Sequence, residues 1–183
     1  HGIQTWVALP MPYEESEPAF VHHPASTLPK ITRGGAVITL IAGQGWAETS
    51  PVRFPHPILY AAIEAEGPAA IELPSETEER AIYLIEGTAS LNGRAIDPLT
   101  MVVLTPDTPA VLTVDAGTRA MVCGGAPLDA PRFMDWNFVS SSKARIEQAK
   151  ADWRASAMNG WIGTPFALPP GEDEHIPLPG DPD

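Results

Sequence analysis

Residues 67–87, GPAAIELPSETEERAIYLIEG, decide the fold of this chain. Two short runs rich in alanine, isoleucine and leucine flank an acidic turn, and a glycine stands at each end of the stretch. Short apolar runs bounded by turn residues predict two strands joined in a hairpin. A hairpin of this kind that ends in Glu-Gly is typical of metal-binding β-barrels, where histidines on alternate residues of a strand hold the ion. This stretch contains no histidine, so it predicts a barrel and raises the question whether the barrel holds a metal.

The strand pattern extends over residues 36–127. Seven short apolar or alternating runs are separated by Gly, Pro, Asp and Asn at close intervals: AVITLIAG, PILYAAIEAE, AAIELP, RAIYLIEG, TMVVLTP, AVLTVDAG and TRAMVCGG. Because no helical periodicity lies between them, they predict an antiparallel sandwich or barrel. The pair Asn92-Gly93 predicts a two-residue hairpin turn, since both residues accept a positive φ. We therefore predict an all-β core over 36–127.

Two segments precede this core. Residues 1–9 alternate weakly and include Trp6, which predicts a strand in need of a partner sheet. Residues 10–35 carry five prolines. Proline fixes φ and removes an N–H donor, so we predict an extended linker there. The sequence starts at His1, inside the predicted strand, and we interpret it as a fragment of a longer protein.

Residues 128–183 are predicted to form one helix followed by an irregular tail. The run Ser140-Ser141-Ser142 offers an N-cap. The spacing of the apolar residues that follow puts four of them on one helical face: Ile146, Ala149, Trp153 and Ala157. The final PPGEDEHIPLPGDPD contains five acidic residues and no lysine or arginine, which predicts an acidic tail without regular structure.

Composition limits the functions open to the chain. The 11 Lys and Arg against 23 Asp and Glu give a net charge of −12, which repels phosphate backbones and argues against nucleic-acid binding. No apolar run is long enough for a membrane span and no signal peptide is recognisable, so we predict a soluble, cytoplasmic protein without a membrane partner. The single cysteine, Cys123, lies in an apolar run and is expected to be a buried, inert thiol.

Residues 67–87 resemble the first motif of the cupin family, which consists of a glycine, two histidines, a glutamate and a second glycine. With the outer glycines aligned, Leu73 and Ser75 fall on the two histidine positions and Glu79 falls on the acid. The resemblance implies a cupin-type antiparallel β-barrel or sandwich, here with one C-terminal α-helix and an irregular acidic tail.

Residues 101–115 resemble the second cupin motif. Thr108 falls on its glycine, and Val111, or Ala110 if the register differs by one, falls on its histidine. Three of the four ligands are thus missing, and a single glutamate cannot hold iron or zinc with useful affinity. We predict no metal, cofactor-binding or catalytic residue in this chain.

Other polar residues do not supply a better site. The three glutamates within 76–79 crowd one turn, and we interpret them as solvated carboxylates, with weak binding of a hard cation as the alternative. Only His56 adjoins the core, where a structural or exposed role is expected. His22 and His23 lie in the linker, and adjacent residues of an extended chain point to opposite sides.

Six segments together, in this order, resemble the second half of a bacterial pirin-family protein: HGIQTWVALP, GWAETSPV, ERAIYLIEG, CGGAPLDAPR, WNFVSSSKARIEQAKADW and IPLP. The resemblance covers essentially the whole chain. Pirins are two-cupin proteins whose metal, usually iron, is held in the N-terminal cupin. The resemblance therefore implies that 1–9 closes a missing first cupin, that 36–127 is a second cupin without metal, and that iron belongs to the missing half.

Three hypotheses about function remain, the first two of which follow from the resemblance. The parent protein resembles a metal-dependent quercetin 2,3-dioxygenase-type oxidoreductase, with this chain as a structural part. Alternatively, the chain is a protein-binding module of the transcription co-regulator kind, or a small-ligand-binding module without catalysis. We expect its partner to be an N-terminal cupin half, or another copy of the chain in a homo-oligomer, paired through strand 1–9.

Overall fold

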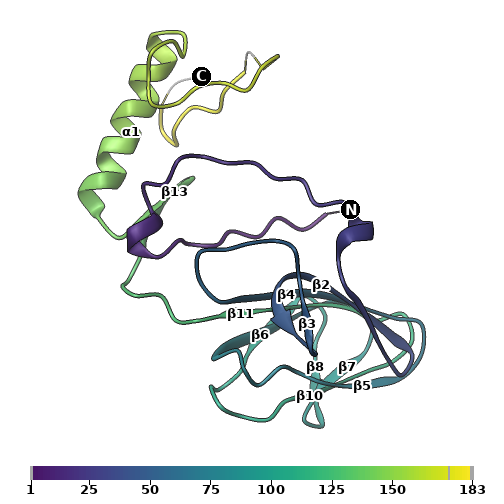
Figure 1. The fold of residues 1–183 in the computed structure, drawn as a ribbon. Helices are drawn as coiled ribbons and strands as arrows, with labels where there is room; N and C mark the ends of the chain where they lie inside the picture. Colours follow the sequence, from purple (N-terminus) through teal and green to yellow (C-terminus); the bar gives the residue numbers. More distant parts are fainter. Residues whose placement is uncertain (1, 173, 182–183) are drawn as a thin grey trace. The chain divides into compact units, whose positions relative to one another are not determined.

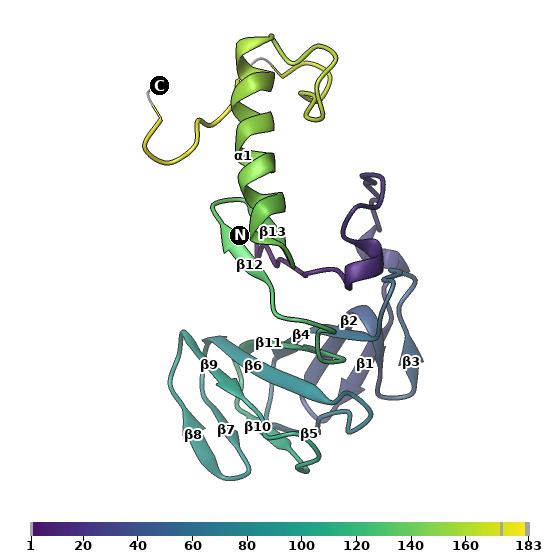
Figure 2. The same cartoon turned by 90° about the vertical axis from the view of Figure 1, so that its left-hand side faces the viewer.

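The computed structural model describes residues 2–172 and 174–181, which form two compact units. The barrel unit is Ser16–Pro127, and the helical unit is His1–Glu15 together with Leu128–Asp183. Figures 1 and 2 show the strands of the barrel unit and the helix α1 of the helical unit from two directions.

Over the described residues, two antiparallel sheets build the barrel unit. The seven-stranded sheet has the order β1-β2-β4-β11-β6-β9, with β3 paired to β2. Its strands are β1 (Lys30–Arg33), β2 (Ala36–Gly45), β3 (Glu48–Thr49), β4 (Ile58–Ala65), β6 (Glu79–Glu86), β9 (Thr100–Val103) and β11 (Arg119–Gly125). The four-stranded sheet has the order β5-β10-β7-β8. Its strands are β5 (Ala69–Glu72), β7 (Ala89–Leu91), β8 (Arg94–Ile96) and β10 (Val111–Val114).

The core lies between the inner faces of these strands. Alternate residues of each strand point to the same face, and the inward set is apolar except for Arg80 of β6: Ile38 and Leu40 of β2, Ile63 of β4 and Leu112 of β10 are all fully buried. Burying a side chain of this size contributes about 1.5–3 kcal/mol. The two-residue period of apolar side chains therefore favours strands, and burial of the apolar faces holds the two sheets together.

The predicted β core is confirmed. The seven predicted runs correspond to β2, β4, β5, β6, β9, β10 and β11. Asn92 and Gly93 connect β7 to β8 with φ angles of 49° and 80°, as the hairpin prediction requires. The fold class, mainly β with antiparallel sheets and one helix, is as expected from the sequence.

The linker predicted over 10–35 is wrong at its C-terminal end. Lys30–Arg33 forms β1, which pairs antiparallel with β2, and its Ile31 is buried in the core. Two short 3₁₀ turns, Met11–Tyr13 and Ala25–Thr27, precede it. A four-residue strand with a single buried side chain is too short to show the periodicity on which the prediction depended.

The helical unit contains a small hairpin and one helix. Strands β12 (Phe133–Asp135) and β13 (Phe138–Ser140) pair antiparallel, and α1 spans Lys143–Met158. The side chain of Ser142 caps α1 by accepting a hydrogen bond from the backbone N–H of Arg145, which confirms the predicted N-cap. On the predicted apolar face, Ile146 and Ala149 are buried. Within the described part of the chain, no helix has the length and apolar composition needed to span a bilayer.

The acidic tail has no regular secondary structure over its described residues, as predicted, but it is anchored to α1. The indole Nε1 of Trp153 donates to the carbonyl of Ile176 at 3.1 Å, and Leu178 is buried. Trp153 also packs edge-on against Trp161 and Phe166, with ring centroids 4.8 and 5.2 Å away. The apolar residues of the tail thus cover the Trp153 side of the helix.

We expect this anchoring to be lost in acid. Arg154 donates to Asp181 from Nε and Nη2, and these bonds hold the pKa of Asp181 below its ordinary value of 3.8. Because the folded-state pKa is lowered, the contribution is complete above the ordinary value and disappears as the pH falls through the lowered one. The indole N–H resonance of Trp153 should therefore shift as the pH falls below about 3.8. The Asp181→Asn variant should lack this transition, and an identical transition in both proteins would disprove the prediction.

Residues 2–9 form no strand within the described chain, so the strand predicted for 1–9 is not formed by this chain alone, and His1 lies outside the described residues. The segment is instead fixed by Arg132. The guanidinium Nη2 donates to the carbonyl of Leu9 at 2.7 Å, and Nε lies 2.6 Å from the Glu14 carboxylate. Both side chains of this ion pair are mostly buried, at 6% and 14% exposed. The N-terminal arm is thereby held within the helical unit.

Candidate functional site

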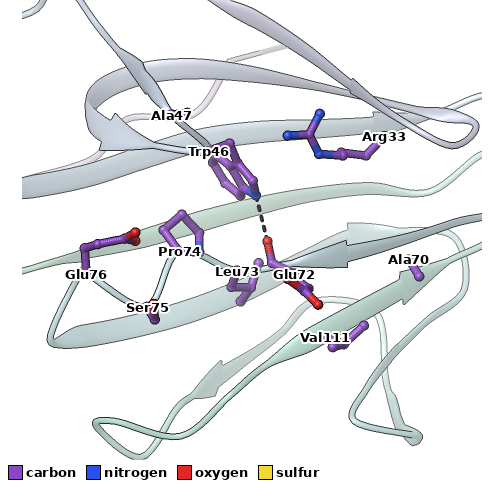
Figure 3. A pocket seen from close by; sticks show the side chains of 10 residues that line it. All are labelled: Arg33, Trp46, Ala47, Ala70, Glu72, Leu73, Pro74, Ser75, Glu76 and Val111. Atoms are coloured by element: carbon purple, nitrogen blue, oxygen red, sulfur yellow. Dashed lines mark hydrogen bonds between the residues drawn. The ribbon is translucent and has the colours of Figure 1, made fainter.

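The barrel unit has an open pocket of about 470 Å³ beside the edge strand β5. Its lining mixes apolar and charged side chains: Arg33, Trp46, Ala47, Ala70, Glu72, Leu73, Pro74, Ser75, Glu76 and Val111. Figure 3 shows Trp46 over this pocket, with Arg33 and Glu76 on opposite sides of the indole. The pocket is a candidate for binding a small molecule in the barrel unit.

Trp46 is held over the pocket at a cost in backbone strain. Trp46 and Ala47 form the two-residue turn between β2 and β3, with positive φ angles of 53° and 68°. Asn92 and Gly93 adopt similar angles in their turn, but those residue types accept positive φ, whereas other residues cost about 1–3 kcal/mol there. A hydrogen bond of 2.7 Å from the indole Nε1 to the carbonyl of Glu72 offsets part of this cost (Figure 3). Trp46 thus connects the β2–β3 turn to the edge of the smaller sheet.

The pocket lies on the outer face of the smaller sheet and not in the barrel interior. In β5, Ala69 and Ile71 are buried in the core while Ala70 and Glu72 are exposed. In β10, Leu112 is buried whereas Val111 is only half-buried. The side chains that line the pocket are therefore the outward-facing set of these strands.

The structure separates the positions that the cupin alignment assigned to metal ligands. Leu73 is 5% exposed and packs in the core while also bordering the pocket, whereas Ser75 is exposed at the pocket. Ala110 is in the core, also at 5% exposed, while its neighbour Val111 lines the pocket. Of the two alternatives for the third histidine, Ala110 therefore occupies the inward position.

The residue that follows the aligned motif acid is a base, and it enters the barrel in place of the acid. Glu79 is exposed, whereas Arg80 is only 2% exposed and shares the inward face of β6 with Ile82 and Leu84. The interpretation of Glu79 as the surviving ligand is thus wrong, because the register of β6 points its side chain to solvent. The guanidinium of Arg80 donates to the carbonyls of Pro74, at 3.1 Å, and Thr108, at 2.8 Å.

These inward residues do not fit a metal ion. Leucine and alanine offer no ligand atom, and a buried guanidinium repels a cation. Among residues 2–172 and 174–181, no three His, Cys, Asp or Glu side chains lie close enough together to hold an ion. Glu76, Glu78 and Glu79 are all exposed, as solvated turn residues would be.

The remaining polar candidates are dispersed. His22 is exposed and His23 half-buried in the segment before β1, and His56 is half-buried before β4. Burial raises the pKa of the Cys123 thiol, which keeps it protonated and disfavours its use as a nucleophile. Sequence reasoning missed both Trp46 and Arg80. The one available signal for the inward position of Arg80 was its spacing: it lies two and four residues before Ile82 and Leu84, so the three share one face of the strand.

Comparison with known proteins connects this fold to one family. The family model described as the pirin C-terminal cupin domain matches residues 60–159. A pirin-like protein of Caulobacter vibrioides is 41% identical over 180 residues, which are 97% of this chain and 59% of that protein. Pirin of Rattus norvegicus is 26% identical over 170 residues, covering 89% of this chain and 58% of that protein.

A solved structure shows the same fold. The crystal structure of a quercetin 2,3-dioxygenase from Acinetobacter baumannii superimposes with a TM-score of 0.75 at 26% identity, covering 93% of this chain and 59% of the other. This chain therefore spans less than two thirds of the length of these three relatives.

Proposed function

Because this chain belongs to the pirin family, we propose that it acts as the C-terminal cupin half of a two-cupin protein and holds no metal of its own. Its part in the whole protein is structural. The relative named quercetin 2,3-dioxygenase supports an oxidoreductase of that type as the parent protein. In such a parent, iron in the N-terminal cupin supplies the dioxygen chemistry, and this chain supplies packing around it.

The observation that carries the proposal is the set of residues facing the barrel interior. Leu73, Arg80 and Ala110 occupy inward positions of the two motif segments, and all are at least nine-tenths buried. The side chains that hold a transition metal in a barrel of this kind are neutral imidazoles, thiolates or carboxylates. A barrel that directs two aliphatic side chains and a guanidinium to that place is suited to packing and not to holding an ion.

We expect the purified chain to contain less than about 0.1 equivalent of iron, manganese, nickel, copper or zinc by elemental analysis, because its inward residues lack ligand atoms. Removal of trace metal with a chelator should leave the thermal midpoint unchanged. A longer protein that also carries an N-terminal cupin is the matched comparison and should retain iron. One equivalent of a transition metal in this chain alone would overturn the proposal.

The outer pocket favours a second candidate, the binding of a small ligand without catalysis. Trp46 offers an aromatic surface, and Glu72, Glu76 and Arg33 offer hydrogen-bonding groups at its rim. Quenching of tryptophan fluorescence by a flavonol in the wild-type chain, but not in a Trp46→Phe variant, would favour this candidate.

The partner proposal concerns residues 2–9, which the helical unit leaves without a strand partner among the described residues. Trp6 and Ile3 are about half exposed there, at 49% and 50%. An N-terminal cupin half supplies the sheet that this segment needs, and a second copy of the chain is the alternative. The compartment we propose is the cytoplasm, where a single half-buried thiol needs no partner.

A further inference from the structure

We propose that the guanidinium of Arg80 is an internal cross-link that takes over the mechanical role of a metal ion in this barrel. The inference rests on the proposed function, because it concerns how a cupin half without metal holds its two motif segments together. In a metal-binding barrel, the ion connects ligands from both segments. Here the side chain of Arg80 alone donates hydrogen bonds to both motif segments.

The contacts of Arg80 define the cross-link. Nη1 donates to the carbonyl of Pro74 in the loop between β5 and β6, and Nη2 donates to the carbonyl of Thr108 in the loop between β9 and β10. These loops belong to the first and the second motif segment respectively. The planar guanidinium directs its donors along fixed directions, so the two loops are held at a fixed separation.

The backbone around Arg80 completes the connection. The carbonyl of Arg80 accepts a hydrogen bond from the N–H of Leu104, and the N–H of Leu73 donates to the carbonyl of Ala110. Strand β6, the 73–78 loop and the 104–110 loop are therefore joined by two side-chain and two backbone hydrogen bonds. Without Arg80, the two side-chain bonds are lost and two carbonyls lose their donor.

Burying the charged guanidinium of Arg80 costs desolvation free energy, which its hydrogen bonds must offset. The residue is 2% exposed, and no carboxylate among the described residues lies within ion-pair distance of it. Its Nε is enclosed without an acceptor. Neutral carbonyls are thus the groups that stabilise the charge.

The test compares Arg80→Met, Arg80→Lys and a control, Leu84→Val, by amide hydrogen exchange and thermal unfolding. Leu84 is fully buried on the same face of β6 and makes no such cross-link. Arg80→Met should lower the thermal midpoint by about 10 °C, because the buried carbonyl of Pro74 and the partly buried carbonyl of Thr108 lose their donors. It should speed exchange at the Leu73 and Leu104 amides at least about tenfold more than at the β2–β4 amides. Leu84→Val should speed exchange to a similar extent at the Leu73 and Leu104 amides and at the β2–β4 amides.

Arg80→Lys should resemble Arg80→Met, because one ammonium lacks the fork that spans both carbonyls. Should either variant fail to fold, wild-type protein labelled with ¹⁵N-arginine decides the matter: the cross-link predicts slow rotation and protected Nη protons for Arg80. Uniform exchange in Arg80→Met, full rescue by lysine, or a freely rotating guanidinium would each overturn the inference. These outcomes are distinct from the failure of the proposed function, which is the finding of a bound metal in the wild-type chain.

Discussion

Replacement of Gly43 by alanine is expected to lower the free energy of unfolding of the barrel unit by about 4 kcal/mol or more. Gly43 lies in β2 with φ at +83°, just after the register shift between Leu40 and Ala42, and pairs with Leu59 of β4. A Cβ atom there would overlap the backbone carbonyl of Ile58. Because β2 and β4 are adjacent strands within the larger sheet, the overlap is relieved only by moving the sheet itself.

The matched control is Gly93→Ala. Gly93 has nearly the same φ, +80°, but a Cβ atom there meets nothing within 4 Å. This variant should lose only about 1–2 kcal/mol, the cost of a left-handed alanine. Urea denaturation of both variants, followed by circular dichroism, measures the difference. Equal losses would show that the overlap with Ile58 is relieved without cost and that the prediction is wrong.

Replacement of Arg132 by methionine is expected to destabilise the helical unit by about 3–5 kcal/mol, because it leaves a mostly buried carboxylate without its cation. The side chain of Arg132 is 6% exposed and lies 2.6 Å from Glu14, and it also donates to the Leu9 carbonyl. Glu14 in turn accepts hydrogen bonds from the backbone and side chain of Ser141. Hydrogen exchange in residues 9–15 should rise as the N-terminal arm detaches.

Arg145→Met provides the control for that prediction. Arg145 pairs with Glu15 at 2.7 Å, but both side chains are well exposed, at 41% and 66%. An exposed pair of this kind contributes about 0–1 kcal/mol. The double variant Glu14→Gln/Arg132→Met should regain part of the stability that Arg132→Met loses, since no charge then remains buried. Similar losses for Arg132→Met and Arg145→Met would contradict the assignment of Arg132 as the residue that fixes the arm.

Local patterns account for most of the fold that could be predicted. The alternation in β2, β4 and β6 is long enough to mark a strand, and Asn92-Gly93 marks its turn by residue type alone. The cap at Ser142 is likewise a local signal. The short strand β1 has no such signal, because it has a single buried residue, Ile31, and its strand conformation depends on pairing with β2.

The candidate site could be predicted only in part. The missing histidines at Leu73 and Ser75 could be read from the alignment, and so could the absence of a histidine at the second motif. The position of Trp46 over the pocket could not, because the turn that places it uses residues that do not favour that turn. The bond from Trp46 to Glu72 joins residues 26 positions apart, and no local pattern encodes it.

From the sequence, strand period, turn residues and the N-cap predict an antiparallel β core with one capped helix, because these signals act over a few neighbouring residues. The pirin type follows from the resemblance of the six segments and not from these local signals. The tertiary structure alone decided that Arg80 and not Glu79 enters the barrel, that Ala110 and not Val111 faces the core, and that Arg132 is buried against Glu14. The reason is the two-residue period of a strand: a register change of one residue exchanges every inward side chain for its outward neighbour. That register is set by pairing with distant strands.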